Sequence, residues 1–462
     1  MAGGTWTIQN KVLPGVYINF YSKAATLVSM GERGVVCIPK VLDWGPVEEV
    51  IEITDPAECF NKLGYDQTSE HLRWFQQLLL GTNRTSGASK VYIWGLKTTD
   101  AVKATGTETS DSSNTLAATA KCFGVRGNNL SVVVNADPDN DASHVKFYVQ
   151  TLLSGEVVDE QILEANAASV ALSGLHNNDW LEFTTKTGNA FATAGIPLTG
   201  GSNGTTMSST AYTNFMNAAE LLTWNVLVFP GSDATLKQTF SNYVKRLTND
   251  EGKKCQLVVS DYTAADSECV ISVYPQVIVP LSGSTFTTEE TLCWVAGASA
   301  GASVSQALTY ASHPDAIAVT PLLTTEQQKT ALQGGQFVLI QQFEKVQVLQ
   351  DINTFTGFSV TKGKQFRKNR VIRVLFDFAN SIYKTYSLYY IGQTDTNEAG
   401  RDFLKAEIIS LLTQYEGQGA MQNVNADDVT VSPGEESDSV VIECYIQPVD
   451  AIEKIYMSVT IS

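Results

Sequence analysis

The chain of 462 residues has no apolar run long enough to cross a membrane. The most apolar stretch, from Leu292 to Tyr310, is interrupted by Ser, Thr, Gln and Gly. The N-terminus also lacks the basic start and apolar core of a signal peptide. We therefore expect neither membrane insertion nor export by that route.

Positive charge is scarce, because 31 Lys and Arg face 48 Asp and Glu, which gives a formal net charge of −17. Such an acidic chain repels phosphate backbones, so we expect no nucleic-acid partner. The hydrophobic share of 43% and the charged share of 17% are typical of folded proteins. The length predicts about three domains.

Motifs for metals and cofactors are missing. The four histidines are scattered singly, and no His or Cys lies within metal-ligand spacing of another. The glycine-rich loops that hold phosphates or dinucleotides are also missing. We expect no metal, no cofactor and no catalytic residues. The cysteines have no close pair, which suits small buried side chains in a reducing cytosol: Cys37, Cys59, Cys122, Cys255, Cys269, Cys293 and Cys444.

One alternative function is a serine hydrolase of the α/β type, with Ser299 as its nucleophile. Residues 297–301, Gly-Ala-Ser-Ala-Gly, match the nucleophile-elbow pattern of that fold. The fold requires an acid and then a histidine downstream, but His313 is the one later histidine and no acidic residue precedes it after Ser299. The small residues fit better with a helix that packs closely against a neighbouring helix or sheet. We favour this structural interpretation.

The secondary-structure patterns predict a multidomain α/β and α+β protein. Short segments between Cys122 and Pro197, separated by Gly, Asn and Asp, predict an antiparallel β-sandwich. The alternation of helices and strands after Gly204 predicts a parallel sheet. The predicted parts are an N-terminal arm (1–22), a small N-terminal α/β unit (23–97), the inserted sandwich (98–199), an α/β middle domain (200–348), an α+β C-terminal domain (349–450) and a C-terminal strand arm (451–462).

Both ends of the chain have the alternating pattern of β-strands. An end strand must pair with a sheet, either in its own chain or in another one. The sequence alone leaves both possibilities open. The apolar residues of the two patterns are Val16, Ile18 and Phe20 at the start, and Ile455, Met457, Val459 and Ile461 at the end.

A cluster of cations stands out in this acidic chain, with six Lys and Arg between Lys362 and Arg373. A helix predicted from Lys364 to about Gln393 would place four of them on one broad face. That face either is solvated or contacts an acidic protein surface, and the sequence does not distinguish the two. The four residues are Lys364, Arg367, Arg370 and Arg373.

A set of short fragments runs in order almost from one end of the chain to the other. They include Pro14 to Tyr17, Ile53 to Pro56, Gly127 to Asn129, Leu198 to Gly201, Gln306 to Tyr310, Asp351 to Thr354, Lys368 to Arg373 and Glu453 to Met457. Together these fragments resemble the contractile tail sheath proteins of phages, phage-like bacteriocins and related injection systems, in particular the branch of Gram-positive phages and prophages.

The resemblance implies a structural protein without a catalytic site. Its copies would form stacked hexameric rings around a tail tube and contract, driving the tube through the bacterial envelope for genome delivery. The implied partners are further copies, the tube protein, and baseplate and tail terminator proteins, in a virion tail assembled in the host cytoplasm. The sandwich would face outward, and the middle domain would be subtilisin-like in topology only. Each arm would add a strand to a neighbouring copy, and the four cations would meet the tube or a neighbour.

Overall fold

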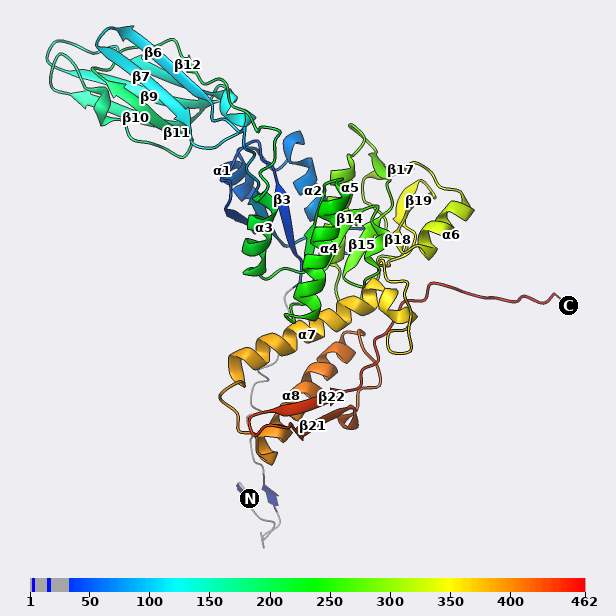
Figure 1. The fold of residues 1–462 in the computed structure, drawn as a ribbon. Helices are drawn as coiled ribbons and strands as arrows, with labels where there is room; N and C mark the ends of the chain where they lie inside the picture. Colours follow the sequence, from blue (N-terminus) through cyan, green and yellow to red (C-terminus); the bar gives the residue numbers. More distant parts are fainter. Residues whose placement is uncertain (1, 5–14, 18–32, 462) are drawn as a thin grey trace. The chain divides into compact units, whose positions relative to one another are not determined.

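The computed structural model describes residues 2–4, 15–17 and 33–461 (Figure 1). The chain divides into two compact units. The larger unit holds the described residues 33–377 and 449–461, and the smaller unit holds the described residues 2–4, 15–17 and 378–448. In the part of the chain that the structure describes, no helix combines the length and the apolarity that a membrane span requires.

The larger unit is built on a seven-stranded sheet in the order β18-β15-β14-β13-β3-β5-β4. Its strands are parallel except β4, which runs antiparallel to β5. The strands are β3 (Val35–Lys40), β4 (Val50–Ile53), β5 (Lys90–Gly95), β13 (Val226–Val228), β14 (Gln256–Ser260), β15 (Val270–Val273) and β18 (Gln336–Phe337).

This sheet combines strands from the predicted parts 23–97 and 200–348. Strand β3 pairs on one side with β5 and on the other with β13, where Val36 lies opposite Val226. The two ranges therefore share one sheet, with the sandwich inserted between them. The central strand β3 needs a neighbouring strand on each edge, because its buried amides must form hydrogen bonds. A local sequence pattern does not reveal which strands these neighbours are.

Helices cover both faces of the sheet (Figure 1). Val36 and Ile38 of β3 belong to the core formed with α2 (Arg73–Leu80) and α5 (Thr288–Gly301). Val35 and Cys37, which alternate with them, belong to the core formed with α3 (Ala211–Glu220) and α4 (Ala234–Asn249). Because side chains alternate along a strand, β3 contributes residues to the core on each face of the sheet. Smaller elements complete this unit: α1 (Cys59–Leu63), α6 (Thr325–Gln333), and the hairpins β16–β17 (Val277–Pro280, Ala316–Thr320) and β19–β20 (Leu339–Gln342, Lys345–Val348).

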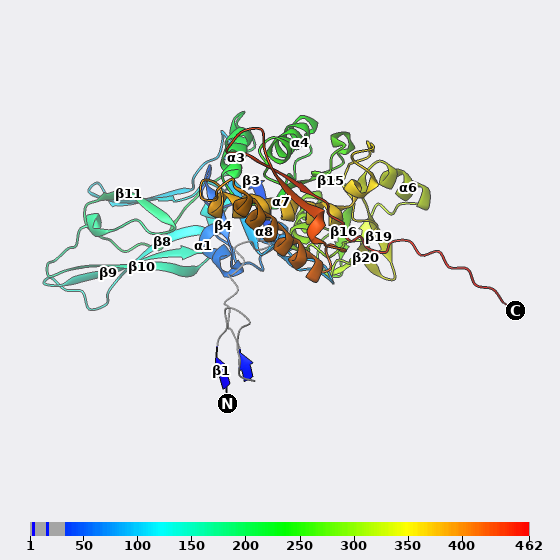
Figure 2. The ribbon, with the colours of Figure 1, turned by 90° about the horizontal axis from the view of Figure 1, so that it is seen from below.

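The predicted β-sandwich is confirmed, as two sheets in the orders β10-β9-β8-β12 and β11-β7-β6 (Figure 2). In β9 every second residue is buried, as Val145, Phe147 and Val149 illustrate. The polar stretch from Thr98 to Thr115 contains β6, which pairs with β7. The strands are β6 (Thr105–Asp111), β7 (Asn114–Ala120), β8 (Leu130–Ala136), β9 (Val145–Leu153), β10 (Glu156–Ala165), β11 (Leu181–Thr187) and β12 (Ile196–Pro197).

In its described residues the smaller unit is built around helices α7 (Asn369–Tyr389) and α8 (Glu398–Gly417) and the hairpin β21–β22 (Val429–Pro433, Val440–Cys444). Helix α7 starts in the larger unit and continues here, where Phe378 packs against Tyr415 of α8 with ring centroids 6.0 Å apart. The hairpin packs on α8 through β21. At the N-terminus β1 (Ala2–Gly4) pairs in parallel with β2 (Gly15–Tyr17).

Candidate assembly site

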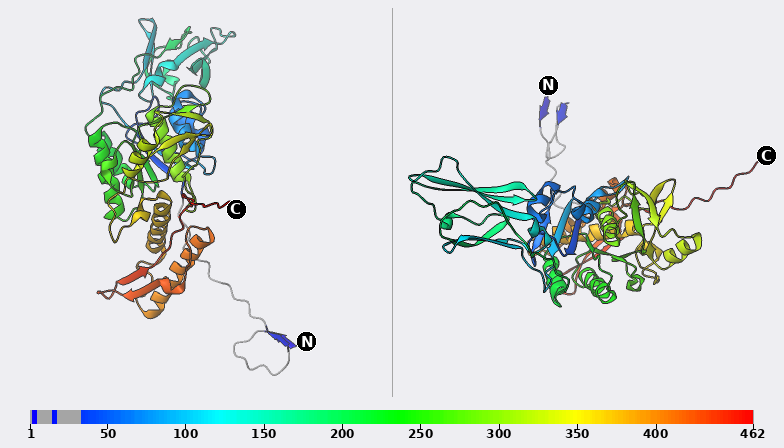
Figure 3. Two further views of the ribbon diagram at one scale, coloured as in Figure 1. Left: turned by 90° about the vertical axis from the view of Figure 1, so that its right-hand side faces the viewer. Right: turned by 90° about the horizontal axis from the view of Figure 1, so that it is seen from above.

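The C-terminal arm, residues 451–462, forms no strand over its described residues and leaves the larger unit as an extended segment (Figure 3). Its apolar side chains lie in water: the exposed fraction is 83% for Ile455, 82% for Met457, 73% for Val459 and 93% for Ile461. The sequence pattern that predicts a strand is therefore present without a partner sheet in this part of the single chain.

At the other end, β2 contains Val16, whose backbone pairs with Gly3 of β1. The strand predicted around Val16, Ile18 and Phe20 is thus described over three residues, Gly15 to Tyr17. Ile18 and Phe20 lie outside the described residues.

The first residues of the C-terminal arm, which we call its root, are held in place by one carboxylate, that of Glu453. Glu453 accepts hydrogen bonds from the Thr309 hydroxyl at 2.8 Å and from the Gln350 amide at 2.6 Å. The Lys368 ammonium group contacts the same carboxylate as an ion pair and lies 3.9 Å from the Asp450 carboxylate. The Glu453 side chain is only 11% exposed. Three separate loops of the larger unit therefore hold Glu453, the last residue with such contacts in the described part of the chain.

A buried polar network continues from this root toward α7. The Thr309 hydroxyl accepts a hydrogen bond from the Asp351 amide at 3.0 Å. The Asp351 carboxylate accepts from the Asn369 amide at 2.9 Å and pairs with the Arg373 guanidinium at 2.5 Å. Asn369 and Arg373 lie in the first turns of α7. The network thus connects the arm root with the start of that helix.

Sequence reasoning missed this network, although the fragments that carry the family resemblance contain its members. Thr309 belongs to the fragment from Gln306 to Tyr310, and Asp351 begins another. Lys368 to Arg373 and Glu453 to Met457 are two more. The available signal was that each of these fragments places polar side chains beside apolar ones. No local pattern shows that the four fragments contact one another in the fold.

Contrary to the prediction from the sequence, the four cations do not share one broad face of a single helix. Lys364 and Arg367 lie in a short 3-10 helix (Lys364–Arg367), and the extended backbone of Lys368 separates it from α7. Lys364 is exposed, whereas Arg373 is 1% exposed and paired with Asp351. Arg373 is therefore a structural residue.

The two middle cations are partly buried. Burial lowers the pKa of the Arg367 guanidinium and that of Arg370 below the usual range, although both remain charged. In Arg367 the Nε and Nη2 atoms are buried and have no hydrogen-bond partner in the described part of the chain. Arg367 is thus a cation with unmet hydrogen-bonding capacity.

The alternative hydrolase site is contradicted by the position of Ser299. The residue lies inside α5, not at a turn between a strand and a helix, and it is 0% exposed. Its hydroxyl has no hydrogen-bond partner among the described residues, while the His313 ring contacts Gln77 at 2.9 Å. A nucleophile needs a base within hydrogen-bond reach and access to substrate, and Ser299 has neither.

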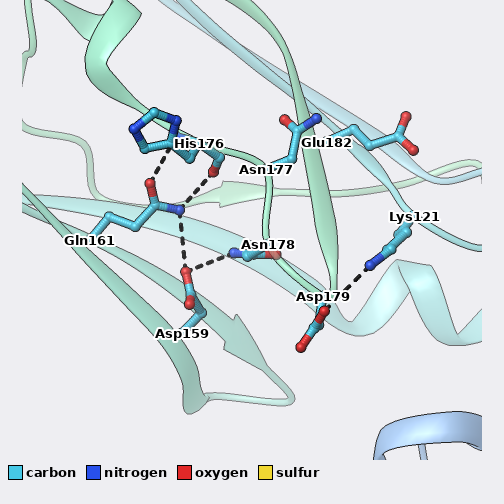
Figure 4. Close-up of a pocket in the computed structure, with 8 residues that line it drawn as sticks. All are labelled: Lys121, Asp159, Gln161, His176, Asn177, Asn178, Asp179 and Glu182. Carbon is cyan, nitrogen blue, oxygen red and sulfur yellow. Dashed lines mark hydrogen bonds and ion pairs between the residues drawn. The ribbon is translucent and has the colours of Figure 1, made fainter.

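A polar pocket lies on the sandwich beside β10 and β11 (Figure 4). The Asn178 amide donates to the Asp159 carboxylate at 2.8 Å, and the Gln161 amide donates to the same carboxylate at 3.3 Å. Gln161 also bonds both backbone groups of His176, at 2.7 and 2.9 Å. These side chains hold the loop before β11 in place, so the pocket is explained by the fold. Among the described residues, no group of His, Cys, Asp or Glu is placed to hold a metal ion.

An apolar cleft of about 510 Å³ lies in the smaller unit. Helices α7 and α8 and strand β22 supply its lining. Phe378, Ile382, Ile408 and Ile442 are among the lining residues. In the described part of the chain β22 pairs with β21 alone, so its outer edge is unpaired beside this cleft.

Four domain families of tail sheath proteins match the chain in succession. The Gp18 domain III N-terminal region matches residues 33–92, the sheath β-sandwich domain residues 99–203, the sheath central domain residues 205–354 and the sheath C-terminal domain residues 361–462.

Individual relatives agree with these matches. The phage-like element PBSX protein XkdK of Bacillus subtilis is 30% identical over 490 residues, covering 100% of both chains. The crystal structure of a sheath tail protein from Desulfitobacterium hafniense has a TM-score of 0.81 and 38% identity, covering 96% of this chain and 99% of that one. The helical sheath of the anti-feeding prophage in its contracted state shares the fold, with a TM-score of 0.54 and 14% identity over 97% of this chain and 99% of that one.

The expectation of a sheath protein is therefore confirmed. The matched families and structures are structural sheath proteins of contractile systems and not enzymes, which also confirms that the chain is no hydrolase. The chain belongs to the family of phage tail sheath proteins.

Proposed function

We propose that copies of this protein polymerise as stacked hexameric rings around a tail tube, and that the sheath contracts to drive the tube through the bacterial envelope. The observation that carries the proposal is the row of exposed apolar side chains from Ile455 to Ile461. A contiguous row of exposed apolar side chains is typical of a surface that a partner covers. The contracted helical sheath that shares this fold supports self-assembly as the function.

We assign the role of partner to the smaller unit of another copy. A strand from the C-terminal arm would pair with the unpaired edge of β22, and its apolar side chains would enter the adjacent cleft. Each large apolar side chain buried in this way contributes on the order of 1.5 to 3 kcal/mol. Four of them on one arm would hold neighbours together while the linkers between domains bend. The N-terminal arm, with Val16, Ile18 and Phe20, would add a second strand.

The cation cluster supplies a contact of a different kind. Lys364 is exposed, and Arg367 has buried nitrogen atoms without hydrogen-bond partners in the described residues. A carboxylate from the tube or from an adjacent copy would pair with Lys364 and with the partly buried Arg367 guanidinium, and Arg370 lies nearby in sequence at the start of α7. Such a contact sets the docking register more than the affinity. Arg373 has no part in it.

The remaining expectations complete this function. The sandwich would face outward, the C-terminal domain would line the inside, and the middle sheet would follow the subtilisin-like topology without its chemistry. The partners would be further copies, the tube protein, and baseplate and tail terminator proteins. The assembled sheath would belong to a virion tail built in the host cytoplasm.

The test compares the two faces of the arm. In one variant Ile455 and Val459 are replaced by Thr, and in the control Ser458 and Thr460 are replaced by Ala. Both variants should fold with the wild-type unfolding midpoint. With tube protein present, electron microscopy should show sheaths for the wild type and the control but not for the apolar-face variant. Normal sheaths from the apolar-face variant would refute the proposal.

A charge test probes the cation cluster. We expect Arg367→Glu to impair assembly around the tube, because it places a carboxylate where the proposed partner supplies one. Lys329→Glu is the control, since Lys329 is exposed on α6 and pairs only with Glu326 in the described part of the chain. Equal sheath yields from both variants would remove this contact from the proposal.

A further inference from the structure

The C-terminal arm changes from buried to exposed at a sharply defined point of the chain. Upstream of it, Glu453 is 11% exposed and bonded to Thr309, Gln350 and Lys368. Downstream of it, Ile455 and Tyr456 are 83% and 90% exposed. The change from held to free chain therefore occurs within two residues.

We propose that Glu453 is the positioning residue of the C-terminal arm, and that its three partners form a latch that sets which residues of the arm can travel to a second copy. The inference rests on the proposed function of the arm as an inter-subunit strand. The latch consists of the Glu453 carboxylate, the Thr309 hydroxyl, the Gln350 amide and the Lys368 ammonium group.

The latch determines the reach of the arm. With Glu453 held, the nine residues 454–462 can span at most about 30 Å when extended. Release of residues 449–453 would add about 16 Å. Since the effective concentration of a tethered strand falls roughly with the −3/2 power of its length, the added slack alone lowers it about twofold. It would also permit a register shift, and a shift by one residue turns Ile455 and Val459 to the opposite face of the sheet.

The latch also connects the arm to the helix that enters the smaller unit. The Thr309 hydroxyl donates to Glu453 and accepts from the backbone of Asp351, whose carboxylate holds Arg373 of α7. Lys368, the residue before α7, contacts Glu453 directly. The start of α7 and the root of the arm are therefore held by one set of side chains. A force that a neighbouring copy exerts on the C-terminal arm would act on these side chains.

Limited proteolysis measures the latch in the unassembled protein. Trypsin cleaves after Lys454, directly beyond Glu453, and needs several extended residues on each side of the bond. Lys368→Met and Thr309→Val leave this cleavage sequence unchanged, so they report the latch alone. We expect removal of residues 455–462 to become about tenfold faster in Lys368→Met. Lys364→Met is the matched control and should cleave at the wild-type rate, and Lys368→Arg should restore most of the protection.

Assembly provides the second measurement. The concentration needed for sheath formation with tube protein should rise at least twofold for Lys368→Met, with no such rise for Lys329→Met, which lies on α6 away from the latch and the cation cluster. Unchanged cleavage after Lys454 would overturn the latch, and faster cleavage with unchanged assembly would overturn its positioning role. Failure of the proposed function is a separate result, because deletion of residues 454–462 would then still permit sheath formation.

Discussion

Arg373 and Asp351 form an ion pair that is closed to water, with a distance of 2.5 Å between Nη2 and Oδ2 and an exposed fraction of 1% for each side chain. The same carboxylate accepts hydrogen bonds from the Asn369 amide and from the Leu308 backbone. Asp351 thus joins the first turn of α7 to the loop that carries Thr309.

Arg373→Met should lower the free energy of unfolding by about 3 to 5 kcal/mol, because it leaves the Asp351 carboxylate buried without its cation. Replacing both residues, Arg373 by Met and Asp351 by Leu, should cost less than the single change, since no unpaired charge remains. Chemical denaturation gives both values. Lys329→Met, which breaks the exposed pair with Glu326, serves as the control and should change stability by less than about 1 kcal/mol. A similar small effect of Arg373→Met would contradict the structural role.

The position of Arg373 illustrates which features the sequence predicts and which it does not. A spacing of three residues correctly indicates a helix through Arg370 and Arg373, but spacing does not show a partner more than twenty residues away along the chain. The extended backbone at Lys368, with ψ of 117°, starts the helix later than predicted and removes Lys364 and Arg367 from it.

The same division applies to the fold. The alternation in β9 predicts a strand with one buried face, and the structure confirms it. Strand β6 has only one buried residue, Gly106, so its sequence resembles a loop and its pairing with β7 depends on tertiary contacts. The sharing of one sheet by β3 and β13 depends on the sandwich being an insertion, and no local pattern reports that. The arm root depends in the same way on loops that are distant in sequence.

Gly297 allows α5 to approach α2 closely, since a Cβ atom there would lie 2.0 Å from the carbonyl oxygen of Leu78. Gly297→Ala should therefore destabilise the fold by about 1 to 3 kcal/mol, because one of the helices must shift. Ser299→Ala on the same helix is the control. It removes a buried hydroxyl without a partner in the described residues and should leave stability unchanged or slightly raised. Thermal unfolding of the two variants measures the difference, and equal midpoints would contradict close packing at Gly297.

The hairpin β19–β20 turns through Phe343 and Glu344, which have φ of 51° and 59°. Two successive positive φ values define the type I′ turn, for which Asn-Gly is the favoured sequence. Phe343 is 85% exposed, so it contributes no packing that would offset the strain in the single chain. Replacement of Phe343 by Asn and Glu344 by Gly should raise the free energy of unfolding by about 1 to 2 kcal/mol. Glu344→Gln removes the charge without relieving the backbone, and a gain equal to that of the double variant would show that charge is the cause.

His313 is expected to make stability depend on pH between about 4 and 6.5. Burial lowers the pKa of its imidazole from 6.5 to about 4, and the ring lies against Trp294 with centroids 5.0 Å apart. The Asp315 amide donates to Nδ1, so Nε2 carries the proton and donates to Gln77, which fixes the neutral form.

The sign follows from the proton count of the two states. Between these pH values the unfolded chain binds a proton at His313 that the folded chain does not, so acid favours unfolding. The contribution of His313 is fully present above pH 6.5 and is lost as the pH falls to about 4, by about 3 kcal/mol in total. Denaturant titrations of the wild type and of His313→Gln at both pH values give the free energy of unfolding of each protein. The loss is the difference between the two proteins in how steeply this free energy changes with pH, which we call the pH slope. His176→Gln, at an exposed histidine of the sandwich, should keep the wild-type slope. Identical pH slopes for the wild type and His313→Gln would show that His313 is not the group that titrates, since the surface carboxylates are common to both proteins.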